Sequence, residues 1–282
     1  MKTQLCKSMI LLILLGIGLG GCHTGTKKAT ENDIQFDSIM VDKTYHFFNK
    51  PENPNCNLQI CFTYPSKFSD KAVLKKLQQN FVLSYFGEEY ADLSPAEATA
   101  KYTDNYLKEY KDLEKDFQEE VENAGDSPVG SWYSYYEMSN DDIVYNENDI
   151  LSYTVYFENY TGGAHGAHAY SNQVLNLKTG KPVTEEEIFV DNYQDNLARL
   201  LVDQIARDCD VENPKELENA GFFSVDEIFP NGNFLVNGEG ITYTFNEYEI
   251  AAYVIGPVKV TLPYETIRFL LKKDSPIASI AF

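Results

Sequence analysis

The sequence predicts an α+β fold with a mixed, largely antiparallel sheet and packed helices. Apolar residues recur at every second position in some segments and at every third or fourth position in others, which are the periods of strands and helices. The two kinds of segment follow one another without regular strand–helix alternation. Most strands are joined by short connections, as in hairpins, so we expect antiparallel pairing to dominate.

The first part of the chain predicts two strands followed by two helices. Residues 34–48 are strand-like, and residues 58–63 alternate between apolar and other side chains before Pro65. The next helix carries its apolar face over residues 74–85. The second begins at a capping box formed by Ser94 and Glu97. Its apolar stripe predicts one unbroken helix as far as residue 124.

The middle of the chain changes to the strand period. Residues 132–145 and 151–160 are predicted strands, joined by the acidic segment 140–149, which we expect to be a solvated hairpin tip. The remaining elements follow in order: a strand over 170–177, a turn over 178–181, a capped helical start over 184–189, a helix over 197–205, strands over 241–245 and 258–262, and a short helix over 264–271.

Residues 1–21 predict a secretory signal peptide. A lysine-containing start precedes an apolar run over residues 9–19, which is too short to span a bilayer. The run ends in Leu-Gly-Gly-Cys22, which resembles the lipobox of bacterial lipoproteins. This resemblance implies cleavage before Cys22, lipid attachment to its sulfur and acylation of the new amine by a fatty acid such as palmitate. An ordinary signal peptide with an incidental cysteine is the alternative.

Two or more acyl chains hold a protein durably on a membrane. We therefore expect the mature chain to be anchored without spanning, through a polar tether over residues 22–35. His23 follows Cys22 where an aspartate would favour retention at the inner membrane. This favours the periplasmic face of the outer membrane as the location.

The charge balance narrows the choice of partners. The chain has 43 acidic and 23 basic residues, a net charge of −20. Removing the signal peptide, which carries two of the basic residues, makes the balance −22. Such a surface excludes nucleic acid as a partner and favours a basic protein or a cation. The alternative is that the acidity only confers solubility.

Three cysteines remain beside Cys22, namely Cys56, Cys61 and Cys209. An odd number does not form a closed disulfide framework. Cys56 and Cys61 lie on opposite faces of one predicted strand, which disfavours a bond between them. A bond from Cys56 to Cys209 and three buried thiols remain alternatives.

We find no recognisable catalytic, cofactor or metal-binding set. His165 and His168, in the glycine-rich stretch after residue 160, could ligate zinc. No third ligand is evident, and a hairpin turn with His165 hydrogen-bonded to the loop is the simpler interpretation. The acidic segment 140–149 lacks the spacing and glycine of a calcium loop. Nucleophile-elbow, phosphate-loop and dinucleotide motifs are also missing from the sequence.

Five short segments of the sequence are distinctive: Tyr160–His165, Leu175–Lys181, Thr184–Phe189, Gly240–Ile250 and Gly256–Pro263. Together they resemble the DUF3298 domain, and their order and spacing make the resemblance specific. The preceding region is similar to the DUF4163 domain. The resemblance implies two closely associated subdomains in an α+β fold, a DUF4163-like region over 36–165 and a DUF3298-like region over 166–282.

The resemblance extends to the extracellular, lysozyme-binding part of RsiV-type anti-sigma factors. It therefore implies an envelope lipoprotein that acts as a non-enzymatic binding module for a protein, such as a lysozyme-like muramidase, or for cell-wall glycan. Related domains accompany peptidoglycan deacetylases. The alternative is accordingly a cell-wall-active hydrolase that uses carboxylates or His165 and His168.

Overall fold

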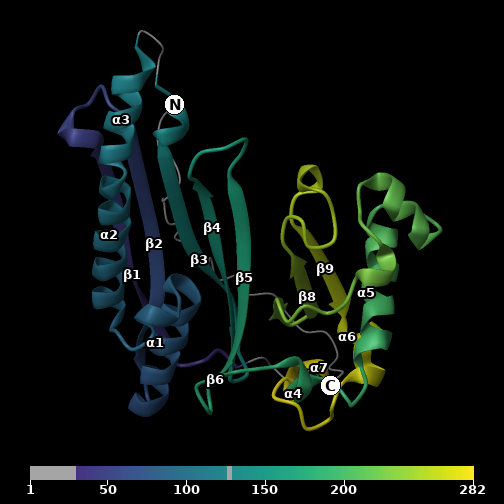
Figure 1. Ribbon diagram of the computed structural model, residues 1–282. Helices are drawn as coiled ribbons and strands as arrows, with labels where there is room; N and C mark the ends of the chain where they lie inside the picture. Colours follow the sequence, from purple (N-terminus) through teal and green to yellow (C-terminus); the bar gives the residue numbers. More distant parts are fainter. Residues whose placement is uncertain (1–29, 126–128) are drawn as a thin grey trace, which may run out of the picture.

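The computed structural model describes residues 30–125 and 129–282 (Figure 1). The predicted signal peptide, residues 1–21, and the predicted lipid attachment site, Cys22, lie outside the described residues. Strands and helices are both abundant, and a six-stranded mixed sheet is accompanied by packed helices. The prediction of an α+β fold is confirmed.

The larger sheet contains six strands in sequential order, from β1 to β6. Neighbouring strands are antiparallel, except that β2 and β3 are parallel. The strands are β1 (Ile34–His46), β2 (Asn55–Phe68), β3 (Tyr135–Glu147), β4 (Ile150–Tyr160), β5 (Ala167–Asn176) and β6 (Lys181–Pro182). A parallel pair needs a long crossover connection, and three helices between β2 and β3 supply it.

These helices lie along one face of the larger sheet (Figure 1). They are α1 (Lys71–Phe86), α2 (Pro95–Asp112) and α3 (Glu114–Ala124). The predicted capping box of Ser94 and Glu97 is confirmed. The prediction of one unbroken helix to residue 124 is wrong. The amide of Leu113 bonds to the carbonyl of Tyr110, three residues back, and this tighter turn ends α2 before α3 begins.

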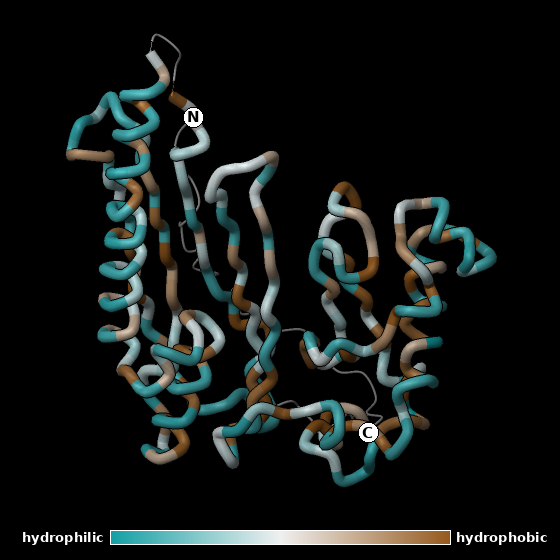
Figure 2. The backbone as a smooth tube through the Cα atoms, viewed as in Figure 1, coloured by the Kyte–Doolittle hydropathy of each residue, from teal (hydrophilic) through white to brown (hydrophobic). Residues whose placement is uncertain are grey.

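The first core fills the space between α1 and the sheet. Leu58, Ile60 and Phe62 of β2 point toward the helices and are almost fully buried. The ring of Phe81 on α1 stacks on Tyr153 of β4 with 3.9 Å between ring centroids. Figure 2 shows this distribution, with apolar residues along β2 and hydrophilic residues over much of α2.

A second unit follows the larger sheet and has its own core. Its antiparallel sheet contains three strands in the order β7 (Phe234–Val236), β8 (Gly240–Phe245) and β9 (Val258–Pro263). Its helices are α4 (Glu185–Ile188), α5 (Gln194–Asp208), α6 (Tyr264–Ile267) and α7 (Ala278–Ala281).

Short 3₁₀ helices occur in both parts of the described chain. They are η1 (Phe47–Asn49), η2 (Glu88–Tyr90), η3 (Ser131–Tyr133), η4 (Pro214–Ala220), η5 (Val225–Glu227), η6 (Tyr253–Ile255) and η7 (Arg268–Leu270).

Asparagine side chains of the second unit join it to the edge of β5. Asn246 Oδ1 accepts from the amide of Tyr170 at 2.7 Å, and its Nδ2 donates to the Tyr170 carbonyl at 3.1 Å. Asn233 Oδ1 accepts from the amide of Asn172 at 2.8 Å. These amides replace a neighbouring strand and satisfy backbone groups at the edge. The larger sheet extends past residue 165, because β5 pairs with β4 along its length.

The expectation of an acidic hairpin tip over residues 140–149 is wrong. Residues 140–147 belong to β3, and the turn is reduced to Asn148 and Asp149. Both have positive φ, 55° and 62°, which two-residue hairpin turns require and which Asn and Asp tolerate. The strand continues through the acidic residues because each pairs with β4, as Asp141 does with Val155.

The end of the predicted tether lies against this turn. Asn32 donates from its side chain to the carbonyl of Ile150 at 2.9 Å, and β1 begins at Ile34. Residues 34 and 35 of the predicted tether 22–35 therefore belong to β1, and its residues 22–29 lie outside the described residues. Throughout residues 30–125 and 129–282, each helix is too short or too polar to cross a membrane.

Candidate functional site

The inward face of β3 is polar, although its neighbours in the sheet are apolar. Tyr135, Glu137, Ser139 and Asp141 occupy alternate positions of β3, and the last three are buried. Glu137 pairs with Leu58 of β2, which faces the helices. The inward face of a central strand is usually apolar, so buried carboxylates at these positions depart from the expected pattern. Such departures from local rules are expected at functional sites.

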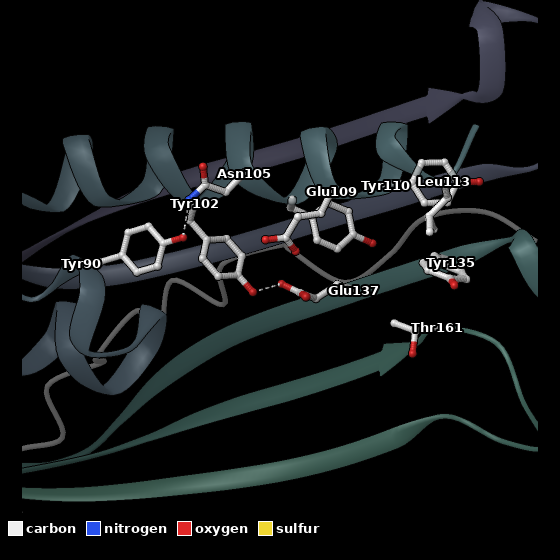
Figure 3. Close-up of a pocket in the computed structure, with 10 residues that line it drawn as sticks. Tyr90, Tyr102, Asn105, Glu109, Tyr110, Leu113, Tyr135, Glu137 and Thr161 are labelled. Atoms are coloured by element: carbon white, nitrogen blue, oxygen red, sulfur yellow. Dashed lines mark hydrogen bonds between the residues drawn. The ribbon is translucent and has the colours of Figure 1, made fainter. Parts of the chain in front are cut away.

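A pocket of about 400 Å³ lies between α2 and the start of β3 (Figure 3). This volume is within the range of small-ligand pockets. Ten residues line it, and five of them are tyrosines: Tyr90, Tyr102, Tyr106, Tyr110 and Tyr135, with Asn105, Glu109, Leu113, Glu137 and Thr161. Among these described lining residues, none is Lys, Arg or His. The pocket thus combines aromatic rings with two carboxylates.

Glu137 forms the polar part of the pocket floor. The Tyr102 hydroxyl donates to its Oε1 at 2.7 Å, and Figure 3 shows this bond between helix and sheet. Glu137 is only 5% exposed, and burial raises the pKa of its carboxyl, which the nearby charge of Glu109 raises further. Burial and the adjoining Glu137 also raise the pKa of Tyr102. The carboxylate therefore lies where a positive charge would be favoured.

Four of the five tyrosines come from one face of α2 and from η2, opposite β3, and Tyr135 comes from β3 itself. Tyr102, Tyr106 and Tyr110 recur every four residues on α2, so they face the sheet together. Tyr110 donates to the carbonyl of Tyr133 at 2.7 Å. The hydroxyl of Tyr106 is buried and has no hydrogen-bond partner among the described residues. A buried hydroxyl without a partner carries a free-energy cost.

Asp141 lies further along the same face of β3, outside the pocket. Its Oδ1 accepts from the amide of Thr63 at 2.7 Å, while Oδ2 is buried without a partner among the described residues. Burial raises its pKa to about 8, against the lowering effect of the Thr63 bond. This carboxyl was expected in a solvated tip. Its inward position makes it a buried acid of the first core.

A second pocket, of about 300 Å³, lies where β5 and β6 meet the second unit. Its wall includes Glu185 of α4, which accepts from the Tyr193 hydroxyl at 2.7 Å and from the amide of Gly232 at 3.0 Å. These bonds join α4 to its neighbours, so Glu185 has a structural role there.

His168 lies between two carboxylates on the other face of the larger sheet. Its Nδ1 is 2.9 Å from Oε1 of Glu247, a residue of the second unit, and its Nε2 is 3.7 Å from Oε1 of Glu158 on β4. Glu158 also accepts from the hydroxyls of Tyr136 and Tyr156, at 3.0 and 2.9 Å. Because each ring nitrogen faces a different acid, the three side chains do not converge on one point.

His165 belongs to the turn after β4. Its Nδ1 donates to the carbonyl of Gly166 at 2.8 Å, and its ring stacks on Tyr253 with centroids 4.0 Å apart. Gly162 and Gly163 have φ of 89° and 101°, which glycine adopts readily. The interpretation of this stretch as a turn is confirmed. In the described part of the chain, no group of three His, Cys, Asp or Glu could hold a metal ion.

The cysteines are separate from both pockets. Cys56 is a buried free thiol, and burial raises its pKa to about 11. Cys209 is an exposed free thiol at the end of α5, and Cys61 is half-buried. The alternative of a bond between Cys56 and Cys209 is wrong, because both are free.

The helical period places Tyr106 and Tyr110 on the apolar stripe of the predicted helix, but it does not identify Glu109 or Glu137 as pocket residues. The sequence does contain a signal for the polar face of β3. Polar residues at alternate positions from 135 to 141 lie in a segment that otherwise has the strand period. That pattern marks one polar face, although the sequence leaves open whether the face is outward or inward.

Comparison with known proteins identifies two matching regions. Residues 186–265 match the family model described as "Protein of unknown function (DUF3298)", which lies within the region 166–282 predicted to resemble that domain. Residues 51–168 match the model described as "Deacetylase PdaC". A search of curated proteins gave no match.

Two solved structures share the fold. A DUF3298 family member from Bacteroides fragilis NCTC 9343 is 35% identical, with a TM-score of 0.84, and the alignment covers 90% of this chain and 99% of that chain. A DUF3298 family protein from Pseudomonas aeruginosa PAO1 is 11% identical, with a TM-score of 0.55, covering 86% of this chain and 96% of that chain. The second likeness concerns the fold alone.

Proposed function

Because the chain belongs to the DUF3298 family, we propose that it is an envelope lipoprotein and a non-enzymatic binding module. In this proposal Cys22 carries the lipid and holds the protein at the periplasmic face of the outer membrane. The region 36–165 is then a relative of DUF4163, and the whole resembles the sensing part of RsiV-type anti-sigma factors. The match of residues 51–168 to the PdaC model supports two modules in this order.

One observation carries the binding role: the tyrosine-lined pocket holds two carboxylates and, among its described lining residues, no basic side chain. Tyrosine presents a large, rigid ring and a polar tip, a combination common at recognition surfaces. The net charge of −22 that remains without residues 1–21 would steer a basic partner toward the surface. We therefore favour a basic protein, with a lysozyme-like muramidase as the partner to test, over cell-wall glycan.

Calorimetric titration of the mature protein with a basic lysozyme at about 0.15 M salt tests this role. We expect saturable binding, while cytochrome c, which is also basic, gives no saturation. Equal binding of both proteins would show that the interaction depends only on the overall positive charge of the partner. Saturation by soluble peptidoglycan fragments instead of lysozyme would assign the module to glycan.

The anchor needs a separate test in cells. Cys22→Ser should move the protein from the membrane fraction to the soluble periplasmic fraction and abolish labelling by a palmitate analogue. A distant serine-for-cysteine control, Cys209→Ser, should leave both unchanged. If Cys22→Ser stays with membranes, another attachment must hold the chain.

A second function has one specific observation in its favour. His168 is oriented by Glu247 at 2.9 Å, as a general base is oriented in many hydrolases, and the PdaC model carries the description of a deacetylase. Incubation of the protein with purified peptidoglycan would reveal released acetate or new reducing ends. Product that disappears in His168→Ala would favour this enzymatic role over binding alone.

A further inference from the structure

We propose that the tyrosine-lined pocket between α2 and β3 receives the side chain of an arginine from the protein partner. This inference rests on the proposed binding function and names the group that is recognised. Three features of the pocket support it: its charge, its aromatic walls and a buried acceptor.

The pocket holds negative charge that the described protein does not balance. Glu137 is 5% exposed and receives one hydrogen bond, from Tyr102. Glu109 lies on α2 beside it and disfavours its ionisation. A cation beside the two carboxylates would favour the charged form of Glu137. A guanidinium group would relieve that repulsion, whereas a neutral sugar would leave it in place.

The aromatic walls suit a flat cation. Five tyrosine rings line the cavity, and cations are attracted to the faces of such rings. Arginine is planar and weakly hydrated, so it stacks on aromatic rings more readily than lysine does. One of these rings already attracts a cation of the protein, since Nζ of Lys101 lies 5.2 Å from the centroid of the Tyr90 ring.

In this proposal the guanidinium group reaches the hydroxyl of Tyr106 as a third acceptor. It is buried at the pocket without a partner among the described residues, and a buried polar group without a partner carries a free-energy cost. Guanidinium has five N–H donors in a fixed fork. The carboxylates of Glu109 and Glu137, together with the Tyr106 oxygen, offer acceptors to these donors.

Nα-acetyl-arginine methylamide is the probe, and its citrulline counterpart is the matched control. Citrulline keeps the planar shape and loses the charge. NMR titration of the mature protein at pH 8 should give saturable shifts at the backbone amides of the pocket with the arginine compound. We expect at least tenfold weaker binding of the citrulline compound.

Two variants place this effect in the pocket. Glu137→Gln removes one charge with little change in shape and should weaken binding of the arginine compound at least tenfold. Tyr106→Phe removes only the hydroxyl and should weaken it several-fold. Glu216→Gln, which removes an exposed carboxylate on η4, should change it less than twofold. Circular dichroism confirms that each variant is folded.

Equal binding of the arginine and citrulline compounds would overturn the proposal, as would folded Glu137→Gln with unchanged affinity. Shifts of the pocket amides with chito-oligosaccharides but not with the arginine compound would also overturn it, in favour of a glycan site. Failure here is distinguishable from failure of the proposed function. Lysozyme binding that survives in Glu137→Gln would retain the binding module and reject this pocket as its site.

Discussion

The hydroxyl of Tyr102 donates to Oε1 of Glu137 across the space between helix α2 and strand β3, at 2.7 Å. It is the bond that ties the helix to the polar face of the strand. Each end depends on the other, since Glu137 is buried and a buried carboxylate needs hydrogen-bond donors.

Replacing Tyr102 by Phe should destabilise the protein. Glu137 would lose its donor and remain buried, at a cost of about 1–3 kcal/mol. Urea unfolding measures the change in free energy. Tyr248→Phe, at a tyrosine that is 56% exposed, should stay within about 0.5 kcal/mol of the parent. If both variants were equally stable, the bond would contribute nothing to the fold.

Asp141 should make stability fall as the pH rises. Its pKa is raised from 3.8 to about 8 in the folded protein, so the folded state holds the proton more tightly than the unfolded state. The contribution is fully present below pH 4 and is lost as the pH rises through 8, on the order of several kcal/mol in total.

Asp141→Asn should flatten this slope between pH 4 and 8. Thermal or urea unfolding across the range measures it, and Asp142→Asn, at the exposed neighbouring position, is the control. That control should keep most of the slope. A parent protein whose stability rises through this window would contradict the assignment.

Asn246→Ala should loosen the connection between the two sheets. The amide and carbonyl of Tyr170 would lose the bonds of 2.7 and 3.1 Å that they now make, at a cost of about 1–3 kcal/mol. Hydrogen exchange should accelerate at the Tyr170 amide. Asn123→Ala, on the surface of α3, should leave that amide unchanged. Unaltered protection in Asn246→Ala would show that the strand edge needs no such cap.

Binding of the arginine compound should strengthen as the pH rises. Burial holds the pKa of Glu137 above its usual value of 4.5, and the cation binds the ionised form. Binding should therefore release protons below the raised pKa. Calorimetry in two buffers with different heats of ionisation measures the release. Glu137→Gln should remove it, and proton release that persists in this variant would assign the titration to another group.

The features that depend on local sequence were predictable. The capping boxes at Ser94 and Thr184 are both present, because the bonds that define them span three residues. The alternation of apolar residues also predicts the paired strands after residue 150. The position of β3 between β2 and β4 is not predictable from local sequence. That pairing turns Glu137 and Asp141 inward, and it is set by strands distant in the chain.

The break between α2 and α3 has a similar cause. The apolar stripe continues from Tyr110 to Phe117 without a change of period, so periodicity alone predicts one helix. In the structure the rings of both residues pack on Phe47, at 4.5 and 5.1 Å between centroids. Contact with a residue more than sixty positions away is not readable from the period of the helix.

The direction of β3 separates the pocket from the end of the molecule that lies nearest the predicted lipid anchor. The strand starts beside the pocket and ends at the turn on which Asn32 packs. Glu137 and Glu147 lie ten positions apart in extended chain, or roughly 30 Å. A lipid on Cys22 would tether the molecule by the turn end, so the pocket would stand clear of the lipid headgroups. A bulky soluble protein could then dock from the aqueous side without touching the bilayer.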